Sequence, residues 1–117
     1  MGKKINTPFE LFGIEVGKGW WPLVEPIYNR IKQLNTEGAG IEISQVKEKY
    51  GMLCIYVHGA PDGIYEMIRD AERKSIHLCE DCGKPAVRVV REHSWIYTLC
   101  PDCLAKRGIK VVINALK

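Results

Sequence analysis

Two pairs of cysteines constrain the fold of this chain more than any other feature of its sequence. Cys79 and Cys82 form one C-x-x-C pair, Cys100 and Cys103 form a second, and 17 residues separate the pairs. A C-x-x-C knuckle curls so that both sulfurs face one point, and two knuckles complete a tetrahedron around zinc. Gly83 directly follows the first pair, and glycine readily adopts the positive φ that such a turn requires. The spacing therefore predicts one structural zinc per chain, held by these four cysteines.

The cysteines have two other interpretations, as a redox pair or as buried apolar groups. A redox C-x-x-C needs only one pair, and no βαβ pattern surrounds either pair here. Buried cysteines can also pack simply as small apolar groups. We interpret the fifth cysteine, Cys54, in that way, because it lies in an apolar strand pattern between Leu53 and Ile55. The N-terminus has no signal-peptide pattern, so we expect a cytoplasmic protein, and disulfides rarely persist in the cytoplasm.

The chain before the cysteines predicts a small α+β core over residues 1–78. Residues 22–34 carry apolar side chains at helical spacing, and residues 61–78 do so again. Between them, residues 41–47 and 51–58 read as two strands joined by a tight turn. The expected core is therefore a helix, a β-hairpin and a second helix.

The predicted zinc ribbon covers residues 79–103 and packs on this core, because no glycine- or serine-rich tether separates the two. Two short strand patterns, AVRVV and SWIYT, form its hairpin, with a cysteine knuckle at each base. So small a hairpin is unstable alone, and bound zinc supplies the missing free energy. The tail, residues 104–117, ends in an apolar run that is typical of a strand. No segment reaches the roughly 18 apolar residues of a membrane helix, so we expect no membrane partner.

Several segments of the chain resemble one group of known proteins. These are GWWPLV at 19–24, QVKEKYGML at 45–53, AERKS at 71–75, CEDCGKP at 79–85 and WIYTLCPDC at 95–103. In order and character they resemble small zinc-ribbon proteins of bacteriophages and prophages, whose activity is mostly unassigned. The resemblance covers residues 19–103 and implies a phage or prophage origin and the cytoplasm of a bacterial host. It implies no activity.

We expect no enzymatic activity and no small-molecule substrate. Four thiolates close the coordination shell, whereas a catalytic zinc keeps one position open for water. A zinc deaminase needs H-x-E and P-C-x-x-C motifs, but here Pro101 follows Cys100 instead of preceding the pair. A degenerate HNH-like nuclease is a minor alternative, with Glu92–His93 in place of its Asp–His pair. The 17 residues between the cysteine pairs leave little room for such a site.

The expected function is recognition of a macromolecule, and a host or defence-system protein is the first choice of partner. Nucleic acid is the alternative, because arginines and an in-phase aromatic pair on the predicted hairpin could form a base-stacking platform. The same hairpin face could instead pack on the core. Two adjacent tryptophans cannot easily both point inward, so one of them could mark a partner surface or staple the first helix. The candidate partner-binding residues are Trp20, Trp21, Arg88, Arg91, Trp95 and Tyr97.

Overall fold

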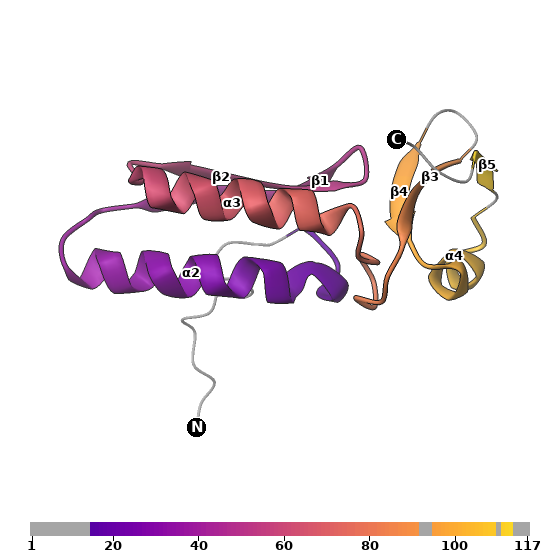
Figure 1. Ribbon diagram of the computed structural model, residues 1–117, viewed down its shortest axis with the longest axis horizontal. Coiled ribbons are helices and arrows are strands. Elements are labelled where there is room, and N and C mark those ends of the chain that lie inside the picture. The colour runs from indigo at the N-terminus through magenta and orange to yellow at the C-terminus, as the bar shows by residue number, and fades with distance from the viewer. Residues whose placement is uncertain (1–14, 92–94, 110, 114–117) are drawn as a thin grey trace, which may run out of the picture.

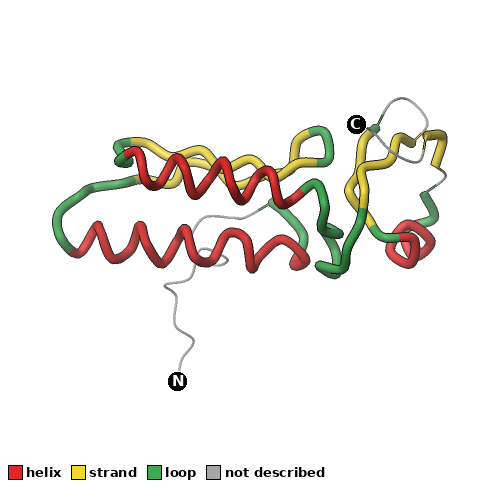
Figure 2. Tube along the Cα trace, viewed as in Figure 1, coloured by secondary structure: helices red, strands yellow, loops and turns green. Residues whose placement is uncertain are grey.

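The computed structural model describes residues 15–91, 95–109 and 111–113, and it confirms the α+β class (Figure 1). The described elements fall into two groups that lie end to end (Figure 2). We call residues 15–78 the helix–hairpin unit and residues 79–113 the cysteine unit. In chain order the elements are η1 (Lys18–Trp20), α2 (Trp21–Thr36), β1 (Glu42–Lys49), β2 (Met52–His58), α3 (Asp62–Ser75), β3 (Val87–Arg91), β4 (Ile96–Leu99), α4 (Pro101–Arg107) and β5 (Val111–Ile113).

Two antiparallel helices pack side by side against a hairpin in the helix–hairpin unit (Figure 1). Pro22 lies in the first turn of α2, where its missing N–H costs little. Apolar side chains at helical spacing on α2 and α3 meet the inward side chains of β1 and β2. Together they bury one core, which comprises Val16, Trp20, Val24, Ile27, Ile31, Ile41, Val46, Leu53, Ile55, Val57, Ile64, Ile68 and Ala71. No helix within the described ranges is both long and apolar enough to cross a membrane.

The turn between β1 and β2 has an unusual residue in it. Tyr50 and Gly51 both have positive φ, 54° and 78°. Positive φ at both central residues is the pattern of a type I′ hairpin turn, which favours Asn-Gly or Gly-Gly. The left-handed conformation costs a residue with a Cβ about 1–2 kcal/mol, so Tyr50 holds a strained position.

The cysteine unit is a three-stranded antiparallel sheet, in the order β4–β3–β5, with α4 beside it. Its buried cluster is small and consists of Cys79, Leu99, Cys100 and Cys103. The sequence predicts a second knuckle at Cys100 and Cys103, and the structure places this pair at the start of helix α4. Cys100 is the N-cap of α4 and Cys103 lies in its first turn, because Pro101 and Asp102 favour a helix start there. The helix then ends at Gly108, which has the left-handed conformation of a C-cap.

Candidate metal centre

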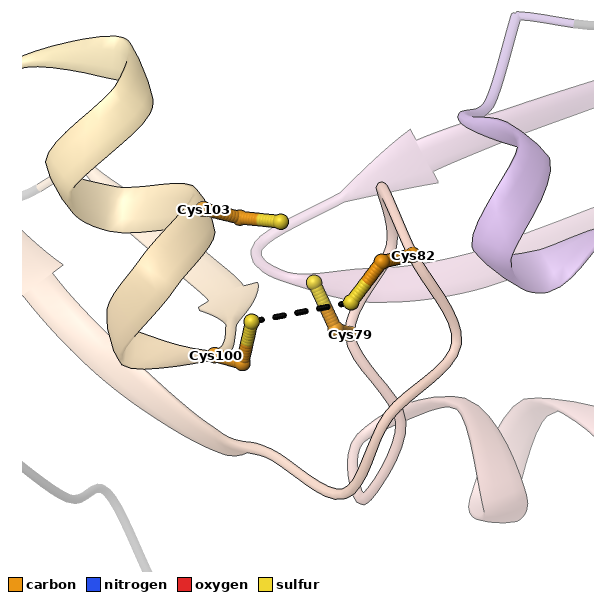
Figure 3. Close-up of side chains that lie close together, drawn as sticks. All are labelled: Cys79, Cys82, Cys100 and Cys103. Carbon is orange, nitrogen blue, oxygen red and sulfur yellow. Dashed lines mark hydrogen bonds between the residues drawn. The ribbon is translucent and has the colours of Figure 1, made fainter.

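The four predicted ligands come together between the turn that follows α3 and the start of α4 (Figure 3). The ligating sulfurs of Cys79, Cys82, Cys100 and Cys103 all lie within 4.8 Å of one another. The Cys82 and Cys100 sulfurs are 3.6 Å apart, and none of the cysteines forms a disulfide. Bonds of 2.3 Å to a tetrahedral zinc place two sulfurs about 3.8 Å apart, whereas a disulfide needs about 2.05 Å. The arrangement therefore fits a single metal ion.

The first pair lies in a hydrogen-bonded turn directly after α3. The Gly83 N–H donates to the Cys79 carbonyl oxygen at 2.9 Å, and the Cys79 N–H donates to the Lys84 carbonyl oxygen at 2.7 Å. Gly83 has φ of 83°, which confirms that this turn needs glycine. The turn holds Cys79 completely buried while Cys82 remains exposed.

The second pair depends on the start of α4. The backbone N–H of Cys103 donates to the Cys100 sulfur and is the main cause that lowers the pKa of Cys100 to about 7. Burial, together with the neighbouring thiols, raises the pKa of Cys103 to about 12. The Cys100 thiolate thus forms readily, whereas Cys103 ionises at neutral pH only if a cation joins it. Thiolates are soft ligands that suit zinc, Cu(I) or iron, so the donor set is that of a transition-metal site.

Besides the four sulfurs, an ion pair connects the segments that carry the two cysteine pairs. The Arg107 guanidinium on α4 donates to both carboxylate oxygens of Asp81, which lies between Cys79 and Cys82, and its Nε is 2.8 Å from Oδ2. The same guanidinium lies 5.7 Å from the centre of the Tyr97 ring. Both Arg107 and Tyr97 are therefore engaged inside the cysteine unit.

Residues 17–20 of the helix–hairpin unit lie against the first cysteine pair. The Gly19 N–H donates to the Glu80 carbonyl oxygen at 2.7 Å, and the Trp20 Nε1–H donates to the Leu78 carbonyl oxygen at 2.8 Å. The Gly17 N–H donates to the Glu80 carboxylate at 3.1 Å. Burial raises the pKa of Glu80, and the hydrogen bond from Gly17 opposes that rise. This contact fixes the metal centre to the core.

A second contact joins the units at the tip of the β1–β2 hairpin. The Thr98 hydroxyl on β4 is completely buried and donates to the Gly51 carbonyl oxygen. The carbonyl oxygen of Thr98 in turn accepts from the Glu80 N–H at 2.9 Å. Thr98 therefore bonds the hairpin tip on one side and the first cysteine pair on the other. Sequence reasoning missed this residue, because nothing near it in the chain shows its partners.

The six candidate partner-binding residues have different environments. Trp20 is completely buried, so the structure corrects that expectation: it anchors the first cysteine pair and has no surface for a partner. Trp21 is partly buried, and its Nε1–H donates to the Val16 carbonyl oxygen. Tyr97 is partly covered by Arg107.

Of the other three candidates, the structure describes the side chains of Trp95 and Arg88. Trp95 is 60% exposed. Arg88 is half-buried, and its aliphatic part lies beside Gly51. The side chain of Arg91 and the Glu92–His93 pair of the nuclease alternative lie outside the residues described. Sequence reasoning also missed Tyr50, which is 67% exposed at the hairpin tip.

The contact made by Trp20 gives a first prediction. Trp20→Phe removes the hydrogen bond to Leu78 and leaves a void in the core, so we expect it to lower the free energy of unfolding by about 2–4 kcal/mol. Chemical denaturation measures the loss, and the metal content should stay unchanged. A loss under about 1 kcal/mol would contradict the anchoring role.

No protein-family model, no curated protein and no solved structure matches this chain. The resemblance to phage zinc-ribbon proteins stays a prediction, and the function must be inferred from the geometry of the site.

Proposed function

We propose that the four cysteines hold one structural zinc ion per chain and that the protein is a non-enzymatic zinc-ribbon protein that binds another protein. The observation that carries the proposal is the closed shell of four sulfurs within 4.8 Å, bonded to the rest of the molecule through Glu80 and Leu78. Four protein ligands leave no position for a catalytic water. The C-x-x-C spacing supports zinc over iron or copper.

A structural role also follows from the size of the cysteine unit. Among its described side chains, the buried cluster holds Leu99 beside three cysteines, and only a few partly buried apolar side chains pack against it: Ala86, Tyr97, Leu104 and Ile109. Such a core cannot offset the conformational entropy of about thirty ordered residues. Structural zinc contributes on the order of 10 kcal/mol to the folding of such a small unit. The zinc would thereby hold a surface in place for a partner.

The charges of residues 73–117, which span the end of α3 and the cysteine unit, favour a protein partner over nucleic acid. Residues 73–117 contain nine Lys/Arg and four Asp/Glu, but zinc with four thiolates adds about −2. Several cations are already paired: Arg107 with Asp81, and both Arg73 and Lys74 with Asp70. These pairs leave fewer cations to meet phosphates.

Nucleic acid remains the second candidate because of one observation. Trp95 is widely exposed beside cationic side chains, and an exposed aromatic ring near cations can stack on a base. A degenerate nuclease gains no support, because its Glu92–His93 pair lies outside the described part of the chain. The resemblance to phage and prophage proteins supports a host or defence-system protein as the partner, met in the bacterial cytoplasm.

Binding of labelled oligonucleotide at two salt concentrations separates the two classes of partner. We expect single-stranded DNA to bind with a dissociation constant of roughly 10 µM or weaker at physiological salt, with no more than three to five phosphate contacts. If the chain instead binds the oligonucleotide with a sub-micromolar dissociation constant, and the double variant Arg88→Ala/Arg91→Ala does not, the partner is nucleic acid and not a protein. Our proposal predicts that the chain captures a protein from bacterial lysate and that nuclease treatment of the lysate does not prevent this capture.

A further inference from the structure

A cleft opens where the hairpin tip of the helix–hairpin unit meets β4 of the cysteine unit. It has a volume of about 360 Å³, and its lining residues are Glu48, Lys49, Tyr50, Trp95 and Ile96. Tyr50 and Trp95 are both more than half exposed, at 67% and 60%. Two large aromatic side chains that line one cleft without being covered are typical of a protein-binding site.

The backbone at Tyr50 supports a role for its side chain beyond folding. Asparagine or glycine at this position would adopt the left-handed conformation at a lower conformational free energy than tyrosine does. The ring is largely exposed, so core packing does not offset the strain. Strain that brings no packing gain points to a function for the strained residue. Gly51 beside it has φ of 78°, which favours glycine in the turn, and a Cβ there would also lie 2.9 Å from Ile96 Cγ2.

The charges around the cleft indicate the chemistry of the partner. The Lys49 ammonium lies 5.9 Å from the Tyr50 ring centre, and the aliphatic part of Arg88 lies beside Gly51 at the hairpin tip. Glu48 also lines the cleft, and its carboxylate accepts from the Gly51 N–H at 2.8 Å. Two cations and one carboxylate leave a net charge of about +1 at the hairpin tip, which suits a single carboxylate of a partner better than a run of phosphates.

We propose that this cleft is the docking site for a protein segment that presents an aromatic side chain next to a carboxylate. The ring would lie between Tyr50 and Trp95, and the carboxylate would reach Lys49 and Arg88. The inference rests on the proposed function and adds the surface and the chemistry of the partner. The cleft has one wall from each unit, joined by the Thr98–Gly51 hydrogen bond, so loss of the metal should also disrupt the docking site.

The test uses a ten-residue glycine–serine peptide with a central aspartate–tryptophan pair. It is titrated against the zinc-loaded full chain while the indole N–H resonance of Trp95 is followed by NMR. We expect a dissociation constant of roughly 1 mM or lower, as suits one buried anchor. Peptides with asparagine–tryptophan or aspartate–alanine at the centre should bind at least about fivefold more weakly, because each lacks one of the two groups.

Two variants separate docking from folding. Tyr50→Asn should weaken peptide binding at least about tenfold while raising the thermal midpoint by roughly 4 °C, because asparagine tolerates the left-handed conformation. Tyr65→Ala removes a tyrosine of α3 that is 36% exposed and does not line the cleft, so it should leave binding unchanged.

Other outcomes would overturn the inference in distinguishable ways. Absence of any Trp95 shift at 10 mM peptide, or equal binding by Tyr50→Asn, would remove the cleft as the docking site. A stronger Trp95 shift with oligo-dT would assign the cleft to nucleic acid. If Tyr50→Asn still captures the nuclease-resistant partner from lysate, the proposed function stands and only the cleft is excluded.

Discussion

Cys100→Ala will leave almost no bound zinc and will unfold the cysteine unit. The substitution removes one of four ligands, and the site contributes on the order of 10 kcal/mol to a unit with a very small core. Elemental analysis should show less than about 0.1 zinc per chain, because three thiolates hold structural zinc far more weakly than four. Amide exchange should lose its protection across residues 79–113, while the larger core of the helix–hairpin unit stays protected.

Cys54→Ala is the matched control for this prediction. Cys54 is a buried free thiol in β2, in a different unit from the metal centre. Its replacement should cost about 1 kcal/mol of stability and leave one zinc per chain. Loss of zinc in Cys54→Ala, or a full equivalent in Cys100→Ala, would show that the ligand set is wrong.

Gly19→Ala should break the contact that joins the first cysteine pair to the helix–hairpin unit. A Cβ at this position would lie 2.5 Å from the Gly83 amide nitrogen and 2.7 Å from the Glu80 carbonyl oxygen, and closer still to the Cys79 carbonyl oxygen. All three are backbone atoms, so no side chain can move aside. We expect a loss of about 3 kcal/mol or more and a thermal midpoint lower by roughly 10 °C.

The control for Gly19→Ala is Gly63→Ala. Gly63 lies in α3, and a Cβ there meets nothing within 4 Å. Alanine favours the helix, so this variant should be neutral or more stable by up to about 1 kcal/mol. If thermal unfolding shows equal effects for the two variants, the close approach of Gly19 to the first cysteine pair is not what holds the units together.

The metal centre could be predicted from sequence because its signal is local. C-x-x-C spacing states which sulfurs converge, and Gly83 marks the turn between them. The α+β core was also predictable, since helical and alternating periodicities differ clearly. The start of α4 at Pro101 was missed, although Pro101 and Asp102 are ordinary helix-start residues, because the knuckle interpretation accounted for the same segment.

Contacts distant in the chain could not be predicted. The hydrogen bonds from residues 17–20 reach partners about sixty positions away, at Glu80 and Leu78, and no local pattern reports them. The two adjacent tryptophans suggested a surface site, yet the Trp20 side chain is completely buried in the core. The position of Tyr50 beside Trp95 could not be predicted either, because it depends on the packing of the two units.

Native mass spectrometry of the full chain, purified without added metal, tests the central claim most directly. We expect one zinc per chain in a compact ion, whose mass exceeds that of the metal-free chain by one zinc less two protons, because a divalent cation replaces two protons at a given ion charge. Removal of the zinc by a chelator should shift the ions to an unfolded charge distribution. A compact protein without metal, or one that carries iron in place of zinc, would contradict the account.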